Sequence, residues 1–299
     1  MKKIAVLQDL SGLGKCSLTA AIPVISAMGV QACPLPTAVL SNQTGYDSYY
    51  CDDYTDKIPL IMKEWEKRNF SPDGIYTGFL AGEAQIEIIL EFLKRFRKEG
   101  TKVIVDPVMG DDGKPYKFYT EDLCRKLRSL VSKADVITPN LTEALLLLEG
   151  GEGMEETWEL LFRETEEKHF QEGIEAVGTR LLSCYTNLKG AAVTGIHFAS
   201  HGDCYIGNLI VERGKSQPGA ERLESSWVYS PKRGGSYSGT GDLFASVISA
   251  GAVKGERLSD SAKRAVRFLE KAIADAVEEG TDRNDGVCFE PYLRMLAEE

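Results

Sequence analysis

The chain has 299 residues, 43 % hydrophobic and 27 % charged, which is ordinary composition for a globular protein of one large α/β domain or two domains of ordinary size. Its formal net charge of −10 at pH 7 argues against a broad surface for nucleic acid or anionic membrane, because either partner needs clustered positive charge. We see no apolar run of membrane-spanning length and no signal-peptide pattern at the N-terminus, so we expect a cytoplasmic protein.

Apolar, β-branched runs alternate with helical patterns along the first two thirds of the chain. Strands are predicted at residues 3–9, 30–40, 74–78, 102–108, 134–140 and 190–195. Amphipathic helices are predicted at residues 58–68, 83–100 and 121–134. This alternation favours a parallel sheet with covering helices.

The pattern changes after residue 195. Residues 203–213 and 225–231 are predicted to be antiparallel strands joined through the polar stretch 214–224, with two long helices after them at about 241–253 and 259–279. The acidic stretch 150–173 is predicted to be an exposed helix and loop. Because we see no repeat and no linker, we predict one domain over residues 1–299. Its fold class would be α/β, a three-layer sandwich with a central, mostly parallel sheet and helices on both faces.

The cysteines and histidines do not indicate a metal site. Seven cysteines are scattered without a Cys-x-x-Cys pair, and three histidines have no zinc-ligand spacing. We therefore expect mostly buried, reduced thiols.

The stretch QDLSGLGKCS at residues 8–17 looks at first like a phosphate-binding loop. Asp9 replaces the first glycine of such a loop, and Cys16 replaces the hydroxyl that would hold Mg²⁺. A Gly-x-Gly-x-x-Gly dinucleotide site also fits poorly, because the next predicted strand lacks the acid that would hold the ribose. A dinucleotide-dependent oxidoreductase is thus disfavoured, and the loop is predicted to contact something other than phosphate.

The strongest local signal is SGTGDLFASVISAG at residues 238–251. Gly239 and Gly241 flank Thr240 immediately before Asp242 and a predicted helix, so free N–H groups converge at the positive end of a helix dipole. Asp242 could simply cap the helix. The alternative is a general base beside an anion hole, as phosphoryl transfer requires.

Polar residues follow two further predicted strands. Asp106 follows the strand in KVIVDPVMGDDG, and Thr138 and Asn140 follow the strand in ADVITPN, with Glu143 in the next helix. Ligands bind beyond the carboxyl ends of parallel strands, so these side chains could line a crevice and hold Mg²⁺. Complementation of the helix dipole by Glu143 and a turn at Asp106 are explanations at least as good when each motif is taken alone.

Together, DPVMGD, ITPNLTEA, AVTG and SGTGD, in this order and spacing, resemble the ribokinase-like superfamily. VLQDLSGLG, PLPTAVLSNQTGY and YTGF narrow the resemblance to the pyridoxal kinase family, over nearly the whole chain. The resemblance implies an ATP-dependent kinase acting on the 5′-hydroxymethyl group of vitamin B6, with ATP as co-substrate, Mg²⁺, a homodimer, and a monovalent cation as a further candidate.

The resemblance also implies roles for particular residues. It makes Asp242 the catalytic base, with the amides of Gly239, Thr240 and Gly241 as the anion hole. The implied ATP or magnesium contacts are Asp106, Thr138, Glu143 and Thr194, with Asp106 and Glu143 for the metal. The implied vitamin contacts are Asp9, Thr44, Tyr46 and Phe79.

One departure bears on the substrate. Asp9 stands where many pyridoxal kinases have serine, and a carboxylate there could pair with a basic group on the ring and favour pyridoxamine or pyridoxine. Hydroxymethylpyrimidine kinases also carry an acid in this loop, so hydroxymethylpyrimidine stays an alternative substrate. A vitamin-binding regulator without catalysis is a further alternative, and the intact Asp242 and its glycines argue against it.

Overall fold

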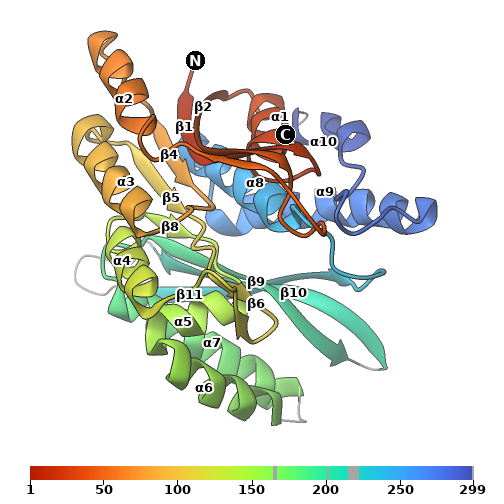
Figure 1. The fold of residues 1–299 in the computed structure, drawn as a ribbon. Coiled ribbons are helices and arrows are strands. Elements are labelled where there is room, and N and C mark those ends of the chain that lie inside the picture. The colour runs from red at the N-terminus through yellow and green to blue at the C-terminus, as the bar shows by residue number, and fades with distance from the viewer. Residues whose placement is uncertain (164–166, 201, 215–221, 298–299) are drawn as a thin grey trace. The chain divides into compact units, whose positions relative to one another are not determined.

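The computed structural model describes residues 1–163, 167–200, 202–214 and 222–297. The chain divides into two compact units, one made of residues 1–104 and 233–299 and the other of residues 105–232. Each unit combines strands with helices (Figure 1). β1 pairs in parallel with β2 and β4, and β8 with β9, so the predicted α/β class is confirmed.

The first unit is built on strands in the hydrogen-bonded order β5-β4-β1-β2-β3. Their bounds are β1 Lys3–Leu13, β2 Gln31–Asn42, β3 Cys51–Asp53, β4 Gly74–Thr77 and β5 Lys102–Val105. β1 pairs in parallel with β2 and β4, and only the short edge strand β3 runs antiparallel to its neighbour. The residues of β4 are all buried, as the uninterrupted apolar run of a strand covered on both faces predicts.

The helices of the first unit pack on this sheet or on one another (Figure 1). They are α1 Ser17–Ala27, α2 Ile58–Lys67, α3 Glu83–Phe96, α8 Thr240–Lys254, α9 Leu258–Glu279 and α10 Arg294–Ala297, with a 3₁₀ turn at Glu290–Tyr292. α8 contacts α1, α9, β1 and β4, and its residues 243–251 are all buried. The centre of this unit's core therefore lies around α8, whose first turn carries Asp242.

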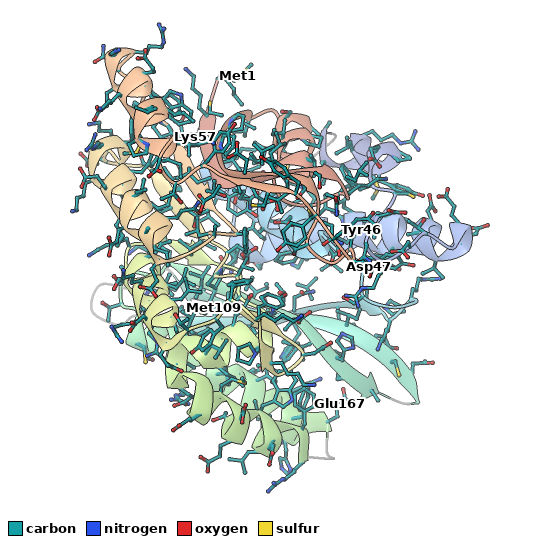
Figure 2. All side chains as sticks on the ribbon, viewed as in Figure 1. Met1, Tyr46, Asp47, Lys57, Met109 and Glu167 are labelled. Carbon is teal, nitrogen blue, oxygen red and sulfur yellow. The ribbon has the colours of Figure 1, made fainter. Side chains whose placement is uncertain are left out.

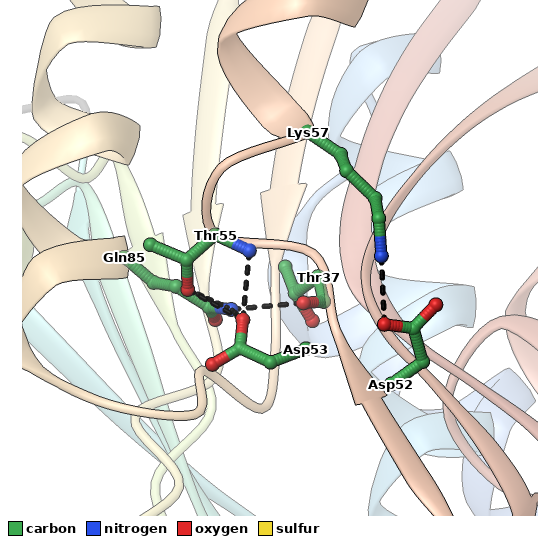
Figure 3. Close-up of polar contacts among 6 residues, drawn as sticks. All are labelled: Thr37, Asp52, Asp53, Thr55, Lys57 and Gln85. Carbon is green, nitrogen blue, oxygen red and sulfur yellow. Dashed lines mark hydrogen bonds and ion pairs between the residues drawn. The ribbon is translucent and has the colours of Figure 1, made fainter.

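Polar contacts fasten the edge strand β3 to the elements around it (Figure 3). The Asp53 carboxylate accepts hydrogen bonds from the Thr55 backbone N–H, at 2.7 Å, and from Gln85 Nε2, at 3.1 Å. Gln85 is buried and also donates to the Thr37 carbonyl at 2.8 Å, while Lys57 pairs with Asp52 at 2.7 Å. The segment after β2 is therefore anchored where it returns to the sheet.

The second unit has strands in the order β11-β10-β9-β8, beside the hairpin β6-β7. Their bounds are β6 Gly110–Asp111, β7 Lys114–Pro115, β8 Val136–Ile137, β9 Gly190–Ser200, β10 Asp203–Gly214 and β11 Arg222–Pro231. The predicted antiparallel strands after residue 195 are confirmed. Residues 215–221 of the predicted connecting stretch lie outside the described residues.

The helices of the second unit are α4 Glu121–Val131, α5 Leu141–Glu149, α6 Gly151–Arg163 and α7 Glu167–Cys184. The acidic stretch 150–173 was predicted to be an exposed helix and loop, and most of α6 is exposed. Residues 164–166, between α6 and α7, lie outside the described residues, so the predicted loop stays a prediction. The stretch is not exposed throughout, because α7 buries Phe170. A side chain on Gly113 would lie 2.7 Å from the Trp158 ring, so α6 also packs against the turn of the β6-β7 hairpin.

Candidate active site

Asp242 lies in the first turn of α8. The position just before this helix sterically requires a glycine. Gly239 precedes the helix in the left-handed conformation, with φ of 81°. A Cβ atom on Gly239 would lie 1.9 Å from the Lys15 carbonyl oxygen, so only glycine lets the α8 start and the β1–α1 loop approach so closely. Asp242 is held beside the β1–α1 loop as a result.

The pKa of the Asp242 carboxyl group lies near neutral pH. Its Oδ2 accepts a hydrogen bond of 2.9 Å from the Ser17 backbone N–H. Burial raises the pKa of Asp242 to about 7, the Ser17 hydrogen bond opposes that rise, and the charge of Asp9 adds to it. Part of the side-chain surface stays accessible although protein atoms surround the carboxylate on most sides. A carboxylate with such a pKa can accept a proton from a bound hydroxyl at physiological pH.

Asp9, Cys16 and Ser17 lie around Asp242, and we call these four residues the Asp9–Asp242 cluster. Asp9 is only 4 % exposed and accepts a hydrogen bond of 2.9 Å from Ser11 Oγ. Burial raises the pKa of Asp9, against hydrogen bonds from Ser17 and Ser11 that lower it. Burial, followed by the charges of Asp242 and Asp9, raises the pKa of the Cys16 thiol to about 12. The cluster therefore brings two acids of the sequence analysis together and keeps the thiol neutral.

The residues expected to form the anion hole open α8. Thr240 Oγ1 donates to the Tyr237 carbonyl at 3.1 Å, which turns its hydroxyl away from the helix amides. A Cβ atom on Gly241 would meet no heavy atom within 4 Å. The helix start thus combines free backbone N–H groups, the positive end of the dipole and open space, as an anion requires.

In the second unit, Asp106 and Thr138 directly follow strands, as predicted, whereas Glu143 lies in the first turn of α5 and Thr194 lies within β9. Asp106 follows β5, and its Oδ1 accepts a hydrogen bond of 3.1 Å from Thr138 Oγ1. Asn140, which follows β8, forms a parallel bridge with Thr194, whose N–H donates to the Pro139 carbonyl at 2.9 Å. Short backbone contacts therefore gather these strand ends.

Glu143 takes part in a capping box at the start of α5. The Glu143 Oε2 accepts from the Asn140 N–H at 2.9 Å, and the Asn140 side chain accepts from the Glu143 N–H at 2.9 Å. Its other oxygen accepts from the Met109 N–H at 3.1 Å. Glu143 therefore caps the start of α5, which is compatible with a role in holding a metal.

The Asp106–Glu143 pair fits a divalent cation. Burial, and then the charge of Asp106, raises the pKa of Glu143 well above its usual range. Positive charge beside these acids would remove that penalty. Among the described residues no group of three or more histidine, cysteine or acidic side chains is close enough to hold a metal ion. Water and phosphate oxygens would therefore complete the coordination of Mg²⁺, as is usual for that ion.

The residues expected to contact the vitamin differ in their contacts with the rest of the protein. Tyr46 is bound to Asp285 through its hydroxyl, and Tyr46 and the neighbouring Asp47 are labelled in Figure 2. The backbone carbonyl of Phe79 accepts from Thr37 Oγ1 at 3.2 Å. Thr44 is exposed in the loop between β2 and β3. Their place in the first unit, with Asp9 and Asp242, is compatible with the expected role, which remains a prediction.

Sequence reasoning missed Ser17 and Met109. Both act through backbone N–H groups, which leave no side-chain signature in a sequence. The positive φ of Ser17, 49°, could not be predicted from the sequence either, because glycine is the residue that usually indicates such a conformation. The Asn-Leu-Thr-Glu spacing at residues 140–143, by contrast, is a sequence signal for the capping box.

The fold is the one found in small-molecule kinases of the ribokinase-like class. The family model described as phosphomethylpyrimidine kinase matches residues 14–286 of the chain. The chain therefore belongs to the phosphomethylpyrimidine kinase family, and the predicted resemblance to ribokinase-like kinases is confirmed.

Solved and curated relatives include proteins of both substrate types. A Bacteroides thetaiotaomicron protein assigned to the phosphomethylpyrimidine kinases, crystallised with pyridoxal, is 34 % identical, with a TM-score of 0.82 and coverage of 99 % of this chain and 95 % of that chain. The pyridoxine/pyridoxal/pyridoxamine kinase of Bordetella avium is 28 % identical over 85 % of this chain and 78 % of its own. The hydroxymethylpyrimidine/phosphomethylpyrimidine kinase of Staphylococcus aureus is 29 % identical over 71 % of this chain and 66 % of its own.

No helix in the described ranges of the chain is both long and apolar enough to cross a membrane.

Proposed function

We propose that this protein transfers the γ-phosphoryl group of ATP to the 5′-hydroxymethyl group of vitamin B6. The observation that carries the proposal is the Asp242 carboxylate, with its pKa raised to about 7 at the start of α8. A base is needed only where an acceptor hydroxyl loses its proton, and the adjacent helix start favours the charge of a transferring phosphoryl group. The family membership and the relative crystallised with pyridoxal support the choice of acceptor.

In the proposed reaction Asp242 accepts the proton of the 5′-hydroxyl group. The hydroxyl oxygen forms a bond to the γ-phosphorus, and the bond from that phosphorus to the β–γ bridging oxygen breaks, so that ADP leaves. The amides of Gly239, Thr240 and Gly241 stabilise charge on the transferred group. Asp106 and Glu143 would hold Mg²⁺, which would neutralise phosphate charge. Thr138 and Thr194 contact ATP.

Asp9, Thr44, Tyr46 and Phe79 are the proposed contacts of the vitamin. Asp9 is suited to a charged or polar ring substituent because it is a buried acid with a hydroxyl partner in Ser11. We also propose, from family resemblance, a cytoplasmic homodimer, which light scattering at micromolar concentration tests through its mass.

A second acceptor, hydroxymethylpyrimidine, is favoured by the family model and by the acid at position 9. It also presents a hydroxymethyl group on a nitrogen heterocycle, so the same base and anion hole would serve. The two acceptors are alternatives for one site.

A coupled assay of ADP release separates these acceptors. Purified protein is given ATP, Mg²⁺ and, in turn, pyridoxal, pyridoxamine, pyridoxine and hydroxymethylpyrimidine, each with and without added potassium. We expect the highest kcat/KM for a B6 form. A higher kcat/KM for hydroxymethylpyrimidine would replace the first proposal with the second, and no ADP release with any of the four would contradict both.

A further inference from the structure

A short turn near the C-terminus, residues 282–286, contacts three loops of the first unit. It follows α9, which ends at Gly280 in the left-handed conformation with φ of 67°. The turn is closed by its own contacts, since the Asp282 carboxylate accepts from the Asn284 N–H at 2.7 Å and its carbonyl from the Asp285 N–H at 3.0 Å.

The first loop that the turn holds is residues 41–46, the proposed vitamin-binding segment. The Gln43 side chain is 7 % exposed and donates from Nε2 to Asn284 Oδ1 at 3.0 Å. Its Oε1 accepts from the Gly45 N–H at 2.6 Å, so one amide side chain joins the turn to the middle of the segment. A Cβ atom on Gly45 would lie 2.6 Å from Asn284 Oδ1, which shows how closely the two approach.

The end of the same segment is tied by Tyr46. Its hydroxyl donates to Asp285 Oδ1. That hydrogen bond, as the largest cause, raises the pKa of Tyr46 to about 12, so the phenol stays a donor at physiological pH. Asn284 and Asp285 therefore hold two residues of the vitamin-binding segment through side chains.

The backbone of the turn reaches the other two loops. The Asp285 carbonyl accepts from the Lys15 N–H at 3.2 Å, two residues before Ser17. The Arg283 carbonyl accepts from the Ser238 N–H at 2.9 Å, next to Gly239. Gly286, with φ of 81°, is packed so closely that a Cβ atom would lie 3.0 Å from Lys15 Cβ and 3.1 Å from the Ser238 carbonyl oxygen.

We propose that Asn284 and Asp285 are positioning residues, which set the affinity for the acceptor by fixing residues 41–46 against the loops that carry Ser17 and Asp242. The proposal rests on the proposed function. Side-chain contacts go to the vitamin-binding segment and backbone contacts go to the catalytic loops. Changes to the two kinds of contact should thus affect different kinetic constants.

The decisive variant is Asn284→Ala. It removes the side-chain acceptor for Gln43 Nε2 and leaves only the longer contact of 3.4 Å to the Asn284 carbonyl. It should raise the KM for the vitamin by about 5- to 20-fold, while kcat and the KM for ATP change by less than about 2-fold. Asn284→Asp keeps an acceptor oxygen and should restore most of the affinity. Because Gln43 and Asn284 form one contact, the Gln43→Ala/Asn284→Ala double variant should be little worse than either single variant.

A matched pair tests Asp285. Asp285→Ala should raise the KM for the vitamin, because it removes the acceptor of the Tyr46 hydroxyl. Asp47→Ala removes the same charge next to Tyr46, from an exposed side chain for which no contact is described, and should leave that KM unchanged. Gly286→Ala, in contrast, should lower kcat, since it displaces the backbone next to Lys15 and Ser238. If Gly286→Ala does not fold, the side-chain variants still test the proposal.

Hydrogen exchange supplies a readout that does not depend on turnover. In Asn284→Ala the amides of residues 43–46 should exchange faster than in the unsubstituted protein, while those of α3 should not change. Unchanged exchange together with unchanged KM would overturn the positioning role. Failure of the unsubstituted protein to phosphorylate any of the four acceptors would instead contradict the proposed function, and the exchange result would then decide whether the turn fixes the segment.

Discussion

The backbone N–H of Ser17 donates a hydrogen bond of 2.9 Å to Oδ2 of Asp242, from a residue whose φ is 49°. A non-glycine residue in the left-handed region carries a backbone cost of the order of 1 kcal/mol. This unfavourable conformation lies at the start of α1, and it points the Ser17 N–H at the Asp242 carboxylate.

Asp242→Asn should lower kcat by about 10²- to 10⁴-fold for every acceptor that the protein uses. The amide keeps the volume and the contact with Ser17, but it cannot accept the proton of the hydroxyl group. Steady-state kinetics with calorimetric binding of ATP and vitamin checks this, because binding should change little. A near-normal kcat would reduce Asp242 to a helix cap.

The pH dependence of kcat/KM should report the same acid. Since burial raises the pKa of Asp242 to about 7, the base is protonated below that pH, so kcat/KM should rise with pH and level off above about 8. The inflection should be shared by pyridoxine and hydroxymethylpyrimidine, because it belongs to the protein and not to the acceptor. An inflection that follows the acceptor's own pKa would speak against this assignment.

Protein stability should vary with pH in the opposite sense. The pKa of Asp242 is raised from 3.8 in the unfolded chain to about 7, so between these values the folded state binds more protons and its stability falls as pH rises. Asp242→Asn has no such proton to lose and should therefore unfold at a higher temperature than the unsubstituted protein at pH 8. At pH 4 the difference should shrink. Calorimetry at both pH values measures it, and a less stable variant at pH 8 would be unexpected.

Asp9→Ser should lower kcat/KM for pyridoxamine more than for pyridoxal. A carboxylate that meets the 4-amine of the ring forms a charge-assisted hydrogen bond, and its loss costs about 1.5–3 kcal/mol. Ratios of kcat/KM for the two vitamers measure the effect. Equal losses would mean that Asp9 does not contact the 4-substituent.

Gly241→Val should harm ATP binding and turnover together, because the branched side chain would fill the space at the α8 start. A Cβ atom there meets no heavy atom within 4 Å, so the chain should still fold. Gly82→Val is a matched control, since Gly82 is equally open and its φ of 168° is extended backbone. The measurement is the KM for ATP of the two variants. Equal values would mean that Gly241 does not contribute to the phosphate site.

The fold was largely predictable because hydrophobic periodicity reports burial directly. The helices at 240–254 and 258–279 lie within a few residues of their predicted bounds. β1 was predicted to end near residue 9, but it continues to Leu13, where it pairs with Asn42 of β2. The glycines and polar residues at 8–13 suggested a loop, and backbone pairing with β2 overrode that local preference. The helix α1 was not predicted, and Pro23 inside it interrupts the usual helical pattern.

The candidate site was predictable only in its side chains. Asp9 and Asp242 are more than 200 residues apart in the sequence and both were singled out, since acids beside glycines are unusual enough to notice. Their mutual influence on pKa, and the part of Ser17, depend on backbone geometry that the sequence does not display.

The Cys16 thiol, with its pKa raised to about 12, has a consequence for chemical inactivation. Alkylating reagents and peroxide attack the thiolate, and at pH 8 only about one such thiol in ten thousand is ionised. A cysteine next to the proposed catalytic acid would ordinarily make an enzyme vulnerable to oxidants. Here burial, more than the neighbouring charges of Asp242 and Asp9, keeps the sulfur atom protonated and so protects it from oxidation.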